Sequence, residues 1–253
     1  MQKIVTRLTV GKPFRDDQNY LAYVKHASNY WIHLKLLADF MQIGTVPQQW
    51  KNLDPNPLGQ QLDEQTRAER IQNRADRVKK TKVCVLDYYT NEVIPHHINS
   101  AEQLSQKLSE ENIDNIKFRL YVVEDLSRDV IETLGYKLGI DPGFFRAHIV
   151  DYAWYNVLDR WRDPPYLDVV GRQQNWVQIR YVTARYFDTT KEFKDAVNDA
   201  KKFNVLRRPD DDLSNKAWWD KRGAIVGVTR SRATFWLQSG HCTRTTAVGR
   251  CSL

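Results

Sequence analysis

Apolar residues recur every three or four positions along residues 17–41, which is the spacing of an amphipathic helix. The stripe includes Tyr20, Tyr30, Trp31 and several leucines, a composition typical of packing in a protein core. Contact with a partner helix or a membrane surface is the alternative. Residues 42–62 follow with three prolines and two glycines, which predicts a linker.

A second helical pattern, residues 63–80, is highly charged and has only a thin apolar stripe. Steps of three, four and three residues place four arginines on one face of this helix: Arg67, Arg70, Arg74 and Arg77. We favour a solvated helix with Glu–Arg pairs, because neighbouring acidic residues dilute the positive charge. The alternative is an arginine ridge that contacts phosphates or another partner.

From residue 82 onward, segments with the pattern of strands alternate with segments with the pattern of helices. Four segments are expected to join one sheet: residues 83–89, 117–123, 176–186 and 223–228. Residues 93–98 predict a short return strand. Residues 223–237 as a whole predict two strand segments around Thr229–Arg232. A helix is predicted over 127–138, with Ser127 as its N-cap, Gly139 as its stop, and a buried face of Val130, Ile131, Leu134 and Leu138.

This alternation predicts an α/β (α+β) fold with a central mixed β-sheet flanked by helices and an N-terminal helical extension. We expect three parts along the chain. Residues 1–80 form the helical extension and the Pro-rich linker, and residues 81–238 form the α/β domain. Residues 239–253 show no periodicity, so we expect an irregular tail.

Composition excludes several classes of protein. Of the 253 residues, 42% are hydrophobic and 27% charged, so wholesale disorder is excluded. The net charge of +7 permits contact with nucleic acid or anionic membranes without requiring it, and nucleic acid is not an expected partner. Three cysteines without a CxxC motif fit a reducing compartment, which predicts a cytoplasmic location. No stretch approaches the ~20 apolar residues that span a bilayer.

Candidate chemistry is sparse. Phosphate-binding glycine loops, zinc motifs and nucleophile elbows are absent from the sequence, so we predict that the chain is not an enzyme. Three adjacent carboxylates can attract a hard divalent cation such as Mg²⁺ in a weak, hydrated site: Asp210, Asp211 and Asp212. A solvated loop is the more common use of such a run. Acid–base chemistry would need Glu132, His148 and Asp151 to converge, and nothing in the sequence brings them together.

Residues 117–238 resemble the soluble N-terminal region of fungal CorA-like proteins, relatives of the CorA magnesium and zinc transporters. The resemblance rests on the order of several motifs rather than on any one of them. These are LYVVEDLSRDVIETLGYKLGIDPGFFRAHI with its Leu138–Pro142 step, then DYAWYN, LDVVGRQQNWVQIRYVTARYF and the closing GAIVGVTRSRATFWL.

The resemblance implies a cytoplasmic domain that self-associates around a pore axis and responds to divalent ions. The family continues into a stalk helix and two transmembrane helices with a Gly-Met-Asn tripeptide, and this chain contains neither the spans nor the tripeptide. We therefore expect a truncated member that does not transport ions by itself. The alternative is a non-catalytic interaction protein that binds a protein, a nucleic acid or an anionic membrane surface through its helical N-terminal region. An unrecognised enzyme would require a deep pocket with convergent polar groups.

Overall fold

A six-stranded mixed sheet forms the centre of the protein in a computed structural model, which describes residues 19–57, 59, 61–110, 116–149, 174–205, 223, 225–239 and 245–249. The strands lie in the order β2-β1-β3-β6-β5-β4. Only β3 and β6 run parallel, and every other neighbouring pair is antiparallel. The strands are β1 (Val83–Tyr88), β2 (Val93–Ile98), β3 (Phe118–Val123), β4 (Trp176–Phe187), β5 (Ile225–Ser239) and β6 (Thr245–Gly249). The predicted mixed α/β fold is confirmed.

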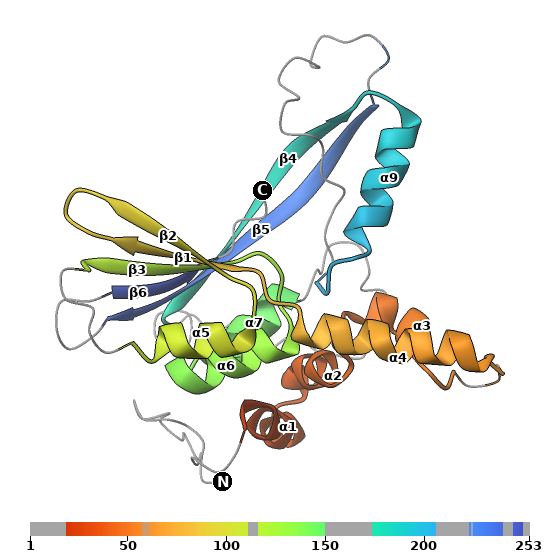
Figure 1. Cartoon of the computed structure of the whole chain (residues 1–253), viewed down its shortest axis with the longest axis horizontal. Coiled ribbons are helices and arrows are strands. Elements are labelled where there is room, and N and C mark those ends of the chain that lie inside the picture. The colour runs from red at the N-terminus through yellow and green to blue at the C-terminus, as the bar shows by residue number, and fades with distance from the viewer. Residues whose placement is uncertain are drawn as a thin grey trace, which may run out of the picture.

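The helices α5, α6 and α7 lie together against one face of the sheet, and α1, α2 and α4 extend this helical layer away from it (Figure 1). The helices of the N-terminal region are α1 (Tyr20–Tyr30), η1 (Ile32–Leu34), α2 (Lys35–Ile43), η2 (Pro47–Gln49), α3 (Trp50–Leu53) and α4 (Glu64–Lys79). Those that alternate with strands are α5 (Ala101–Leu108), α6 (Arg128–Leu138), α7 (Pro142–Ile149) and α9 (Thr190–Ala200). Within the described ranges, none of the helices is both long and apolar enough to cross a membrane.

Local sequence signals account for the limits of α6. Its N-cap, Ser127, accepts a hydrogen bond from the Val130 amide, and Gly139 ends the helix in the left-handed region at φ 63°. Val130, Ile131 and Leu134 are fully buried, and Leu138 packs at the edge of the same cluster. The predicted helix and its buried face are therefore confirmed.

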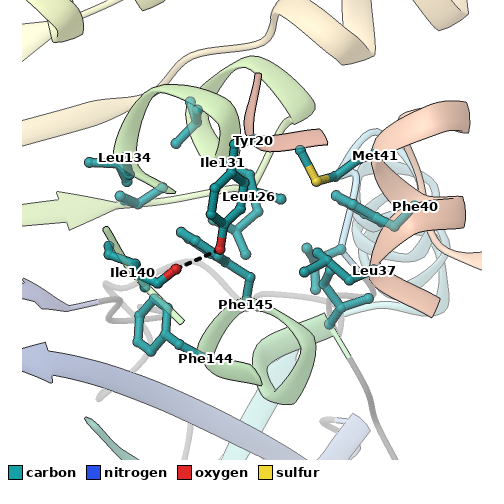
Figure 2. Packing of buried hydrophobic residues seen from close by; sticks show 14 of the residues in the cluster. Tyr20, Leu37, Phe40, Met41, Leu126, Ile131, Leu134, Ile140, Phe144 and Phe145 are labelled. Carbon is teal, nitrogen blue, oxygen red and sulfur yellow. Dashed lines mark hydrogen bonds between the residues drawn. The ribbon is translucent and has the colours of Figure 1, made fainter. Parts of the chain in front are cut away.

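The hydrophobic core lies between the sheet and the helices, with Tyr20 near its centre (Figure 2). The Tyr20 hydroxyl donates to the Ile140 carbonyl at 2.6 Å, and its ring packs edge-on against Phe145. A Cβ at Gly135 would lie 2.6 Å from the Tyr20 ring, so only glycine allows α6 to approach this closely. The N-terminal helices are thus part of the same core as the sheet.

Two predicted boundaries were wrong because tertiary contacts override local periodicity. The single helix expected over 17–41 is interrupted at Trp31, and α1 and α2 pack against each other there. A straight helix of that length would span about 37 Å and carry its apolar stripe past the core. The two strand segments expected in 223–237 form one strand, β5, because β4 pairs with it along its length.

Residues 245–249 correct the expectation of an irregular tail, because they form β6 inside the sheet. This strand pairs with β3 on one side and β5 on the other. It therefore joins the β2-β1-β3 half of the sheet to the antiparallel pair of β5 and β4. The predicted linker, residues 42–62, likewise contains the short helices η2 and α3.

The sheet face opposite the helices is apolar. We call it the apolar face; its described members alternate with the core residues along five strands. They are Val93, Pro95 and His97 of β2, Cys84, Leu86 and Tyr88 of β1, Phe118, Leu120 and Val122 of β3, Phe235 and Leu237 of β5, and Val177 and Ile179 of β4. None of these residues carries a formal charge, and all are exposed or half-buried. On the same side, Ala233 opposite Ile179 is buried, and Arg185 lies farther along β4, beyond the apolar face.

Candidate functional site

The largest cluster of charged side chains in the described part of the protein is organised around Asp87 on the helical side of the sheet. Asp87 of β1 lies directly opposite Arg119 of β3 in the antiparallel register. The Arg119 guanidinium binds both carboxylate oxygens, donating from Nε to Oδ1 and from Nη2 to Oδ2 at 2.8 Å. Both residues are buried, with exposed fractions of 0% and 5%. Two-pronged pairing of this kind fixes the orientation of both side chains.

Three further side chains surround this pair. Lys107 of α5 places its Nζ 3.4 Å from Asp87 Oδ2 and 2.9 Å from Glu110 Oε2. Arg119 Nη2 also donates to Glu110 at 3.1 Å. His96 Nε2 of β2 lies 3.2 Å from Asp87 Oδ2. We call Asp87, Arg119, Lys107, Glu110 and His96 the ion cluster.

Charge pairing decides the ionisation of Asp87 and Arg119. Burial by itself raises the pKa of Asp87, but the hydrogen bonds and positive charges of Arg119 and Lys107 outweigh it and hold this pKa below its ordinary value. Burial acts on Arg119 in the opposite sense and is likewise outweighed, so the pKa of its guanidinium is raised. Asp87 is therefore an anion whose oxygens are already occupied by cations. Such a carboxylate ties α5 to the sheet and is poorly placed to act as a base or a metal ligand.

The predicted arginine face of α4 has a different role from the one expected. Arg70 donates to the carbonyls of Lys51 and Asp54 at the end of α3. Arg74 donates to the Gln42 carbonyl in the last turn of α2. The carbonyls at helix ends lack partners within their own helix, so a cation there satisfies them and opposes the negative end of the helix dipole.

Arg77 repeats this arrangement at the end of α9. It donates to the Lys201 carbonyl at 2.8 Å and to the Phe203 carbonyl at 3.1 Å. The solvated-face interpretation is therefore wrong for Arg70, Arg74 and Arg77, because each binds backbone of another element. Arg67, one turn nearer the start of α4, is exposed.

Asp125 fixes the segment that follows α9. Its side chain is fully buried and accepts hydrogen bonds from the Lys80 ammonium at 3.0 Å and from the Asn204 and Val205 amides at 2.9 and 3.2 Å. Its neighbour Glu124 pairs with Lys82 at the surface. Asp125 thus joins the end of α4, the loop after β3 and the segment after α9, and it does not cap α6, a role taken by Ser127.

Of the three residues considered for acid–base chemistry, the structure describes Glu132 and His148, and each has a separate partner. Glu132 accepts from the amides of Tyr20 and Leu21 and so caps the start of α1; burial raises its pKa despite these bonds. His148 Nδ1 lies 2.8 Å from the Thr234 hydroxyl. Asp151 lies outside the described residues, as do the predicted metal ligands Asp210, Asp211 and Asp212. Among the described residues, no group of three or more His, Cys, Asp or Glu side chains could hold a metal ion.

One exposed apolar feature lies at the junction of α1 and η1. Tyr30, Trp31 and Ile32 are consecutive in the chain and expose 74%, 61% and 54% of their surfaces. We call these three residues the aromatic corner. The ring of His26 packs edge-on against Tyr30, and that of His33 packs edge-on against Trp31. The sequence placed Tyr30 and Trp31 on the buried stripe, and the interruption at Trp31 turns them outward.

The sequence contained a signal for the ion cluster that the alternation of apolar residues obscured. Phe118, Leu120 and Val122 suggest an apolar face of β3, yet the core side of the strand carries Arg119, Tyr121 and Val123. A charged residue flanked by apolar neighbours in two strands of the chain, Asp87 and Arg119, would have indicated a buried pair if the strands were neighbours in the sheet, as β1 and β3 are.

The chain matches no model of a known protein family, and a search of curated proteins finds no similar sequence.

Proposed function

We propose that this chain is the cytoplasmic, non-catalytic domain of a CorA-like protein, with an ion-sensing or regulatory role and no transport of its own. The observation that carries the proposal is the order of the elements over residues 117–238. A strand, a helix, the Leu138–Pro142 step, a short helix and two strands with a helix between them follow one another in the order of the motifs that carry the resemblance. They correspond to β3, α6, α7, β4 and β5.

The Leu138–Pro142 step supports the proposal because most of its residues have separate structural tasks. Gly139 ends α6 in the left-handed region, and the fully buried Ile140 accepts the Tyr20 hydrogen bond. Asp141 accepts from the Gly143 amide, and Pro142 begins α7. Because four of its five residues have a structural role, this motif is more specific evidence for the resemblance than its length suggests.

Ion sensing predicts that Mg²⁺ stabilises the protein through Asp210, Asp211 and Asp212. A hydrated site with a Kd of about 1 mM would add about 1.4 kcal/mol at 10 mM Mg²⁺, which raises Tm by about 2–4 °C. Thermal unfolding is measured in MgCl₂ and in NaCl of equal ionic strength. The shift is expected to disappear when all three aspartates are replaced by Asn.

A matched control removes three exposed carboxylates from α4: Glu64→Gln, Glu69→Gln and Asp76→Asn. This variant changes the net charge equally and is expected to keep the Mg²⁺ shift. A shift that survives in the Asp210–Asp212 variant, or no shift in the unmodified protein, contradicts the ion-sensing role.

The aromatic corner favours a second candidate function, attachment to an anionic membrane surface. Tryptophan and tyrosine partition into the membrane–water interface, and nearby lysines attract anionic headgroups. Residues 20–38 contain Lys25 and Lys35, of which Lys35 lies 4.0 Å from the carboxylate of Asp39. The Arg70, Arg74 and Arg77 side chains bind backbone carbonyls, so the N-terminal region supports this role better than it supports nucleic-acid binding.

Co-sedimentation with vesicles tests this second candidate. We expect the protein to bind vesicles of phosphatidylcholine with 30 mol% phosphatidylserine and to lose at least tenfold in affinity when Tyr30, Trp31 and Ile32 are changed to Ser. Ile71→Ser is the control, because Ile71 is 52% exposed on α4 and lies outside the corner. Equal binding by the corner variant and the control would exclude the aromatic corner as the contact.

A further inference from the structure

The apolar face differs from an ordinary solvated sheet face. Antiparallel sheets that meet water on one side alternate apolar residues with polar ones. Here the outer side of β1 and β3 is apolar as well as most of the core side, and it carries Leu86, Phe118, Leu120 and Val122. Charged residues make up 27% of the chain, yet none occurs among the described members of this face. An uncharged, apolar surface on this side of several neighbouring strands marks a site of association.

We propose that the apolar face binds the same face of a second copy of the chain, so that two sheets stack into a dimer. The helices α5, α6 and α7 lie on the opposite side of the sheet (Figure 1). In the described part of the molecule, the helix α9 contacts this side only at the far end of β4, where Phe193 packs on Phe187. Two sheets packed in this way lie about 10 Å apart with their strands offset by about 30°. A twofold axis makes one patch serve both partners.

Charge favours a second copy as the occupant. The chain carries a net charge of +7, so most pairings of its surface bring positive charges together. The apolar face avoids this repulsion because it contains no formal charge. A charged or polar partner would gain nothing there, whereas an identical uncharged face buries apolar surface on both sides.

The size of the face fits this use. Six strands about 4.8 Å apart and five to six residues long give a footprint of roughly 500 Å² before the relief of the side chains is added. Stable interfaces bury about 800 Å² of accessible surface per partner. The apolar face is therefore of the order that a micromolar homodimer requires, and a single short helix would not cover it.

Sedimentation velocity on the full chain from 1 to 100 µM tests the proposal. We expect a species of twice the 29.8 kDa monomer mass at the upper concentrations. Leu120→Lys and Val122→Lys are made as two separate variants. Each places one ammonium group per protomer, and so two per dimer, in the interface and should weaken dimerisation at least 100-fold. The control is Val182→Lys, because Val182 of β4 is 63% exposed and lies outside the apolar face. Circular dichroism identifies any variant that fails to fold.

Cys84 gives an independent measurement, because its free thiol lies half-buried on the apolar face. Labelling with a maleimide, followed at the Cys84 peptide by mass spectrometry, should slow at least tenfold between 1 and 100 µM protein. A monomer at all concentrations overturns the proposal. In that case a protected Cys84 indicates that another part of the chain covers the face, and a reactive Cys84 indicates an open face. A dimer that both lysine variants preserve overturns it as well.

Discussion

Replacing Asp87 by Asn is expected to lower the free energy of unfolding by about 3–5 kcal/mol, because it removes the buried counter-charge of the Arg119 guanidinium and leaves only the exposed carboxylate of Glu110 beside it. Lys107 and Glu110 retain their own pair at 2.9 Å, so the loss is concentrated on Arg119. Urea unfolding followed by circular dichroism measures the change as a lower midpoint at constant slope.

The double variant Asp87→Leu/Arg119→Met is the informative control. Removing both charges together leaves no buried unpaired ion, so the protein should recover most of the stability lost in Asp87→Asn. A double variant as unstable as the single one would mean that Asp87 acts through shape or through His96 rather than through the charge of Arg119. A loss below about 1 kcal/mol in Asp87→Asn would mean that the pair is solvated.

Acid should reproduce the effect of Asp87→Asn. The pKa of Asp87 is lower in the folded protein than in the unfolded chain, so its contribution is fully present above the unfolded value of about 4. That contribution is lost as the pH falls through the folded pKa. Stability should therefore decline below about pH 4, and the decline should be shallower in the double variant, which has no Asp87 to protonate.

Sequence patterns predicted the elements that carry their own signals. The helix α6 has a serine cap, a glycine stop and apolar residues at helical spacing, and all three agree with the structure. The strands β1, β3, β4 and the first part of β5 were predicted within a few residues, because valine and aromatic residues alternate along them.

Elements whose stability comes from distant partners could not be predicted in the same way. The strand β6 has five residues without a pattern, and it is held between β3 and β5 by pairing on both sides. The break at Trp31 contains no proline or glycine. We attribute it to packing, because the break lets α1 lie beside α2 with Tyr20 against Gly135 of α6. Local sequence does not contain these long-range contacts.

The same limit applies to charged side chains. Periodicity placed Arg67, Arg70, Arg74 and Arg77 on one face of a helix, and in the structure all four belong to one helix, α4. Periodicity could not indicate that the ends of α2, α3 and α9 would contact three of these arginines. Charged residues at helical spacing therefore predict that the side chains lie on one face of the helix. The elements packed around that face decide whether the side chains contact solvent, phosphate or backbone.

Changing Arg70, Arg74 and Arg77 together to Gln is expected to lower the free energy of unfolding by about 2–4 kcal/mol. Each arginine donates a charge-assisted hydrogen bond to carbonyls at the end of another helix, and glutamine is too short to restore it. Arg77 should contribute most. Its hydrogen bonds to Phe203 and Asn204 are half-buried, whereas those of Arg70 and Arg74 are exposed, and burial lowers the pKa of the Arg77 guanidinium.

Arg67→Gln on the same helix is the matched control, and it should change stability by less than about 0.5 kcal/mol because Arg67 is exposed. Urea unfolding of the two variants separates the alternatives. If the arginine face were only solvated, the triple variant would resemble the control apart from small losses of ion pairing along α4. A loss several times that of Arg67→Gln, with native secondary structure retained, instead requires that the arginines hold α2, α3 and α9 to α4. The helical N-terminal region would then be an integral part of the fold rather than an extension of it.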